Sequence, residues 1–139
     1  MEDQTHIAKF KSAFTQLYPQ LSEQEWNYIS THCLVHSANL RDIIIREGAL
    51  QKNIFYLTDG LVRGFYINEK GNDITIHFAN NTGWITHYSA LLTSTPSKYQ
   101  FQALENSIYV SLPYLIVQGG YQKYKGLEKF GGLMAEQNL

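Results

Sequence analysis

The chain lacks the features that mark several large classes of protein. It has 139 residues and a single cysteine, Cys33, which excludes an internal disulfide, a cysteine-rich zinc site and a four-cysteine iron–sulfur site. No apolar run approaches the length of a membrane span, and the acidic start MEDQTHIAKF has no apolar core of signal-peptide length. These absences predict a soluble cytoplasmic protein in a reducing compartment.

Basic clusters are also missing. Eleven lysines and arginines against twelve acidic residues give a formal net charge of −1, with no basic stripe of the kind that binds nucleic acid. We therefore expect DNA contact only through a part of the protein outside these residues. Aromatic residues, in contrast, are abundant: ten tyrosines and seven phenylalanines favour strands and pocket walls over a helical bundle.

The strongest strand signal runs from residue 53 to 83. Turn residues at 59–60 and 69–71 interrupt apolar runs, which predicts an antiparallel meander of hairpins. Ile74, Ile76 and Phe78 alternate with polar residues, so we expect them to form one wall of a half-buried sheet. Further strands are predicted around the β-branched run at 43–45 and from 99 to 112.

Helical patterns flank these strands. Apolar residues recur at spacings of three and four over residues 5–18, with Thr5 as the expected N-cap. Ser22 and Glu25 form a capping box that starts a second helix, and Cys33 is interpreted as a buried small hydrophobe. A short helix is expected within 84–95. Two helical pieces follow Pro113, the second from about Leu127.

The order of elements and several short motifs together resemble the sensor domain of Crp/Fnr transcription regulators. The resemblance implies a mainly β fold, an antiparallel β-roll or jelly-roll barrel of the cyclic-nucleotide-binding-domain type. In one domain over residues 1–139, the N-terminal helices lie in 1–33, the roll in 34–112 and the C-terminal helices in 113–139. The residues that carry the resemblance are Gly48, Phe55-Tyr56-Leu57-Thr58-Asp59-Gly60, Val62-Arg63, Gly71, Ile74-Thr75-Ile76 and Ala103-Leu104-Glu105-Asn106-Ser107.

Members of that family hold a cyclic phosphate in a cassette made of a Gly-Glu-aliphatic-Ala run, a short helix and an arginine. Residues 86–97 resemble this cassette, and matching Ala90, Leu91, Leu92 and Pro96 without gaps shows three replacements. His87 stands at the family's glycine, Tyr88 at its glutamate and Ser97 at its arginine. Because the arginine and the helix start grip the phosphate, we expect no tight binding of cAMP or cGMP.

The cassette region leaves two interpretations open. Its side chains could line a pocket for another small-molecule effector. Alternatively the region is a relic, closed by Trp84 and Tyr88 packing inward. The candidate pocket residues are Trp84, His87, Tyr88, Ser89, Ser97 and Tyr99.

A metal site and catalysis receive little support. Gly71 and His77 have the first spacing of the cupin metal motif, but Ala79 stands where its second histidine belongs. Asp59 and Asp73 occupy turn positions, where an aspartate bonds its own backbone. We expect no cofactor, no metal and no catalytic residue, and keep a cupin-like metal-dependent enzyme as an alternative.

The last helix supplies the expected partner surface. The resemblance implies that it pairs with its twin in a homodimer and continues into a helix-turn-helix DNA-binding domain, which these residues lack. A stand-alone dimerisation module that pairs with longer relatives is a further alternative, and no membrane partner is expected. The predicted dimer residues are Leu127, Phe130, Leu133 and Met134.

Overall fold

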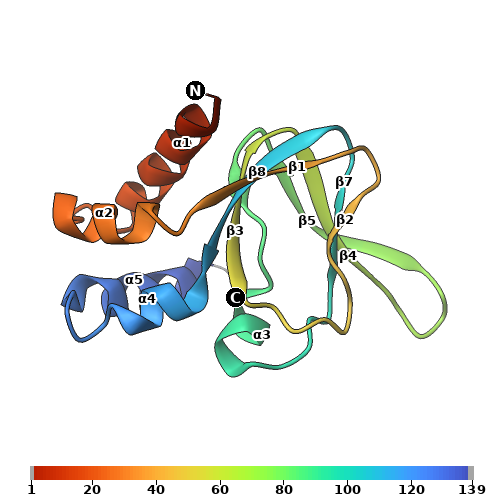
Figure 1. Cartoon of the computed structure of the whole chain (residues 1–139). Helices are drawn as coiled ribbons and strands as arrows, with labels where there is room; N and C mark the ends of the chain where they lie inside the picture. Colours follow the sequence, from red (N-terminus) through yellow and green to blue (C-terminus); the bar gives the residue numbers. More distant parts are fainter. Residues whose placement is uncertain (1, 138–139) are drawn as a thin grey trace.

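The computed structural model describes residues 2–137 and consists of a two-sheet roll with helices gathered against the outer face of one sheet (Figure 1). The order of elements matches the predicted mainly β fold with flanking helices, so that fold class is confirmed. The elements are α1 (Glu2–Leu17), α2 (Glu23–Ser30), β1 (Leu34–Ala38), β2 (Ile43–Ile45), β3 (Asn53–Asp59), β4 (Leu61–Ile67), β5 (Asp73–Asn80), β6 (Gly83–Trp84), α3 (Tyr88–Thr93), β7 (Gln100–Ala103), β8 (Ser107–Pro113), α4 (Tyr114–Gly119) and α5 (Lys125–Gln137).

Each sheet has four antiparallel strands. One has the order β1-β8-β3-β6 and the other β2-β7-β4-β5. One apolar cluster lies between the first sheet and helices α1, α2, α4 and α5, and includes Ile54, Val110 and Leu112. A smaller cluster lies between the two sheets and includes Leu57, Val62 and Phe101. The roll therefore has its own apolar interior, separate from the helical core.

The predicted hairpin at Asp59-Gly60 is wrong. Strand β3 belongs to the first sheet and β4 to the second, so the chain changes sheets at Gly60. Gly60 has φ +113°, and a Cβ there would overlap the side chain of Ser107. Gly60 therefore allows the sharp bend at which the chain passes from the first sheet to the second. The second predicted turn does join a hairpin, β4 to β5, closed by Asn68 N–H donating to Asn72 O at 2.9 Å.

The predicted wall of Ile74, Ile76 and Phe78 is also wrong. Ile76 is 46% exposed and Phe78 is 59% exposed. The β4–β5 register passes from Gly64↔His77 to Phe65↔Thr75, so Ile76 is an extra residue in a bulge. Residues on either side of a bulge lose their shared face, which leaves Phe78 pointing outward.

Local signals at the helix starts fared better. Glu25 N–H donates to Ser22 Oγ at 3.1 Å and Ser22 N–H donates to Glu25 Oε1 at 2.9 Å, which confirms the capping box. Thr5 is not an N-cap, because α1 already includes Glu2. Cys33 is buried just after α2, where burial raises the pKa of its thiol to about 12. Within residues 2–137, no helix is both long and apolar enough to cross a membrane.

Candidate functional site

The cassette region is anchored at its start by two residues from the preceding loop and strand. Gln51 Nε2 donates to His87 O at 2.9 Å, and His87 N–H donates to Gln51 Oε1 at 3.0 Å. Phe55 N–H donates to Thr86 Oγ1 at 2.9 Å, and Ile85 N–H donates to Phe55 O at 3.0 Å. The backbone N–H of His87, the N-cap residue of α3, is therefore bonded to Gln51 within the chain.

His87 is the centre of a small aromatic group. Lys98 N–H donates to His87 Nδ1 at 3.3 Å, so Nε2 carries the proton and donates to Ser89 Oγ at 3.1 Å. The imidazole lies 4.6 Å from the Tyr99 ring, which lies 5.9 Å from Tyr66. Burial, and secondly Lys98, lowers the pKa of His87. The imidazole is thus poised to stay neutral.

Tyr66 extends this group onto the inner face of the second sheet. It shares the face of Val62 and Gly64 on β4, since side chains two apart on a strand point the same way. A Cβ on Gly64 would lie 3.0 Å from the Phe101 ring, so Phe101 fills the interior beside it. Aromatic side chains therefore occupy the inner space between α3 and this sheet.

Ser97 acts as a structural residue. It is 2% exposed, and its Oγ donates to Tyr99 O at 2.7 Å. Its backbone pairs with the β2–β3 connection, since Ser97 N–H donates to Ala49 O and Gly48 N–H donates to Ser97 O. No cation stands at this position, and the adjacent Lys98 is exposed.

Arg63 of β4 is bonded to groups outside the cassette region. Arg63 forms a bidentate pair with Asp73, with Nη1–Oδ1 and Nη2–Oδ2 both at 2.8 Å. Its guanidinium also stacks 3.7 Å over the ring of Phe65. Arg63 precedes Gly64 on β4, so it lies on the outer face, away from the cassette.

Trp84 and Tyr88 belong to the helical core. The Trp84 ring lies 5.7 Å from Phe10 and 4.8 Å from Tyr56. Tyr88 is fully buried, and its hydroxyl has no hydrogen-bond partner among the described residues. Burial, with smaller contributions from Tyr114 and Tyr121, raises its pKa. Both residues lie as the relic interpretation of the cassette expects.

Of the six predicted pocket residues, four therefore gather and two lie elsewhere. His87, Ser89, Ser97 and Tyr99 come together beside the roll. Tyr66 also belongs to this group without having been predicted, although alternation along the strand from Val62 identifies its face. Gln51, a loop residue, carries no local signal that predicts its bonds to His87.

The predicted dimer residues lie largely inside this chain. Leu127, Phe130 and Met134 are fully buried in the helical core, and Leu133 is half-buried. Phe130 stacks on Phe14 with ring centroids 3.6 Å apart and an interplanar angle of 7°. A second copy could contact the three buried side chains only if they left the helical core.

Three histidines outside the cassette form separate hydrogen bonds within the fold. His6 Nδ1 lies 2.6 Å from Thr58 Oγ1, His36 Nε2 lies 2.7 Å from Ser111 Oγ and His77 Nε2 lies 3.3 Å from Trp84 O. Over residues 2–137, no group of three His, Cys, Asp or Glu side chains is placed to hold a metal ion.

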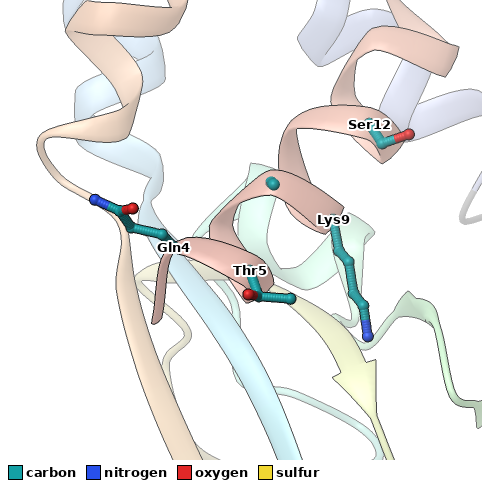
Figure 2. A pocket seen from close by; sticks show the side chains of 5 residues that line it. Gln4, Thr5, Lys9 and Ser12 are labelled. Atoms are coloured by element: carbon teal, nitrogen blue, oxygen red, sulfur yellow. The ribbon is translucent and has the colours of Figure 1, made fainter. Parts of the chain in front are cut away.

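The molecule also has hollows outside the cassette. One lies along α1, where Figure 2 shows Gln4, Thr5, Lys9 and Ser12 on a helix surface. It is widely open, and Lys9 Nζ already donates to Thr58 O at 3.1 Å. A more enclosed hollow of about 350 Å³ lies at the β2–β3 connection.

Solved structures share this fold at low sequence identity. A cyclic nucleotide-binding domain from Methylobacillus flagellatus KT superposes with a TM-score of 0.78 at 12% identity, covering 94% of this chain and 76% of that one. The sensor domain of the transcriptional regulator DNR from Pseudomonas aeruginosa gives 0.71 at 14% identity, covering 88% and 86%. The catabolite activator protein of Thermus thermophilus gives 0.73 at 16% identity, covering 87% of this chain.

This chain spans only 57% of the length of the Thermus thermophilus protein. No curated protein sequence matches it. A profile of the cyclic nucleotide-binding domain matches residues 36–124, which is more than half of the chain and contains the whole cassette region. Together with the two-sheet roll and its inserted helix, this match shows that the chain belongs to the cyclic nucleotide-binding domain family.

Proposed function

We propose that the chain is the effector-sensing regulatory domain of a Crp/Fnr-like transcription regulator, and that it does not bind cAMP or cGMP tightly. The observation that carries the second part is Ser97. A buried hydroxyl that donates to Tyr99 O stands where the family's arginine would hold a phosphate. A hydrogen bond to a charged group contributes about 1.5–3 kcal/mol, so losing a bidentate arginine removes a large share of the affinity.

Two further features support the same proposal. Tyr88 replaces the family's glutamate and is buried in the helical core, so it offers no acceptor to a ribose hydroxyl. Tyr99 and His87 lie with their rings 4.6 Å apart beside the cassette. These two side chains supply no fixed cation to a phosphate, because burial lowers the pKa of His87.

Calorimetry with cAMP and with cGMP tests the proposal directly. We expect no binding with a micromolar Kd for either nucleotide; such binding would contradict it. The double variant Ser97→Arg with Tyr99→Ala restores a guanidinium and clears space, and should gain cyclic nucleotide affinity. Ser89→Ala is the matched control at an exposed position and should gain none.

Two family properties remain proposals for this chain. DNA binding requires a helix-turn-helix domain beyond these residues, so a gel shift with the 139-residue chain should show no sequence-specific complex. A homodimer through Leu127, Phe130 and Met134 of α5 requires these side chains to leave the helical core, because they are buried in it. Light scattering tests this, since a homodimer has twice the 16.0 kDa of one chain.

No observation favours the cupin-like enzyme. The role proposed here is regulatory and without catalysis, as is typical of the family to which the chain belongs. Elemental analysis that finds stoichiometric zinc, iron or manganese in the purified protein would contradict this part of the proposal.

A further inference from the structure

The hollow at the β2–β3 connection is a second place where a small molecule fits. It is lined by residues 43–46 and 49–53 and by Phe55, and none of the cassette residues contributes to it. Its volume of about 350 Å³ lies at the lower end of the range for small-molecule sites, about 300–1,000 Å³. In Figure 1 the connection runs from β2 to the start of β3 and passes close to α3.

Part of the lining of the hollow is apolar. Ile44 and Phe55 are half-buried, while Leu50 is 60% exposed. The Phe55 ring packs against Tyr109 at 5.3 Å and His36 at 6.5 Å, which fixes this wall in place. A ligand that covers Leu50 and Phe55 would gain about 25 cal/mol for each Å² of apolar surface removed from water.

The charge of the hollow is of one sign. Arg46 and Lys52 are the charged residues in its lining, and both are exposed. Neither side chain forms a hydrogen bond or an ion pair within residues 2–137, unlike Arg63, which is bound to Asp73. No acidic residue lines the hollow, although Asp42 and Glu47 lie next to it in the sequence.

We propose that this hollow binds a small amphipathic anion, a carboxylate on a short apolar chain or ring. The apolar part would lie against Leu50 and Phe55, and the carboxylate between the cations of Arg46 and Lys52. The inference goes beyond the proposed function, because it concerns residues outside the cassette. Cyclic nucleotide binding at the cassette would overturn that function and leave this site untouched.

Two lining residues connect the hollow to the start of α3. Gln51 bonds both backbone groups of His87, and Phe55 bonds residues 85 and 86. A ligand that moves or orders the β2–β3 connection therefore acts on the helix start through bonds of 2.9–3.0 Å. Through these bonds, binding of a ligand in the hollow would affect the start of α3, which lies in the cassette region that the family uses for sensing.

The test is a ¹H–¹⁵N NMR titration of the full chain with sodium octanoate, which combines an apolar chain with a carboxylate. We expect shifts at amides of residues 43–55 and at His87 and Ser89. Octan-1-ol lacks the charge and acetate lacks the chain, so both should bind at least about tenfold more weakly. Equal binding of octanol, shifts confined to other surfaces, or no shifts at millimolar octanoate would overturn the proposal.

Two variants distinguish binding in the hollow from non-specific binding of octanoate to exposed cations. Arg46→Gln with Lys52→Gln should weaken octanoate binding about tenfold. Both cations are lost, but each is exposed, so solvent and salt already weaken its attraction for the carboxylate. Lys70→Gln, an exposed cation on the β4–β5 turn, is the matched control and should bind like the unmodified chain. Loss of affinity in the control as large as in the double variant would refute the site.

A separate variant examines the connection to α3. At octanoate concentrations that still shift the amides of residues 43–46, Gln51→Ala should lose the shifts at His87 and Ser89, because the side-chain amide that bonds the connection to His87 is gone. Persistence of those shifts would disprove the route through Gln51. The amide spectrum of each variant without ligand verifies that its fold is intact.

Discussion

Phe130 of α5 stacks on Phe14 of α1, with ring centroids 3.6 Å apart and planes 7° from parallel. The contact joins the two ends of the chain across the helical core. Phe130 is one of the residues that the resemblance in sequence predicts at a dimer interface. The contact holds α5 against α1 in the helical core that covers the first sheet.

The first prediction concerns this stack. Phe130→Ala should lower the free energy of unfolding by about 3–5 kcal/mol, because it removes a fully buried ring and leaves a cavity. Urea denaturation followed by circular dichroism measures the change. Lys129→Ala, its exposed neighbour, should change stability by less than about 0.5 kcal/mol. Similar losses in both variants would show that the stack contributes nothing specific.

The second prediction concerns a pair of tyrosine hydroxyls. Tyr88→Phe should raise the free energy of unfolding by about 1 kcal/mol, because it removes a buried hydroxyl that has no partner among residues 2–137. Tyr28 Oη donates to Ile116 O at 2.6 Å, so Tyr28→Phe should lower stability by about the same amount. Opposite signs in thermal or urea unfolding are the expected outcome. Destabilisation by Tyr88→Phe would mean that its hydroxyl is bonded in solution.

The third prediction compares two glycines with positive φ. Gly60→Ala should lower stability by about 2–5 kcal/mol, because the new Cβ adds an overlap with Ser107 to a strained backbone. Gly71 has φ +83° with open space around it, so Gly71→Ala should lose only about 1–2 kcal/mol. Equal losses would argue that the corner at Gly60 can relax away from Ser107.

The fourth prediction concerns the dependence of stability on pH. His36 is half-buried, bonded to Ser111 Oγ at 2.7 Å and stacked 5.0 Å from Tyr109. Burial lowers its pKa from the ordinary 6.5, so the folded chain binds fewer protons than the unfolded chain just below that pH. The stability from this group is complete above pH 6.5 and is lost as pH falls toward the lowered pKa.

Urea unfolding at several pH values between 7.5 and 5 gives the free energy of unfolding as a function of pH. This free energy should change less steeply with pH for His36→Gln than for the unmodified chain. A residual slope is expected, because burial lowers the pKa of His87 in the same direction. An unchanged slope would mean that His36 titrates alike in the folded and unfolded chain. NMR titration of the imidazole resonances measures the two pKa values independently.

The features that sequence predicted correctly are those set by neighbouring residues. The capping box at Ser22 and Glu25 depends on two hydrogen bonds within four residues. The strands follow from alternating runs, and the family match confirms the resemblance on which the fold class was built. Such signals require no knowledge of distant partners.

The features that it missed depend on distant partners. A turn at Gly60 reads as a hairpin locally, and only the pairing of β3 with β8 and β4 with β7 separates the two strands. The bulge at Ile76 arises between strands, so alternation within β5 cannot show it.

The strand order has a consequence for how the chain is made. Strand β8 lies between β1 and β3, and β7 lies between β2 and β4, so the last two strands of the roll complete both sheets. A ribosome-bound chain that ends before residue 100 has neither central partner and leaves the edges of β1 to β4 open. Because such long-range closure is slow, nascent chains of this protein should depend on chaperones until β8 emerges.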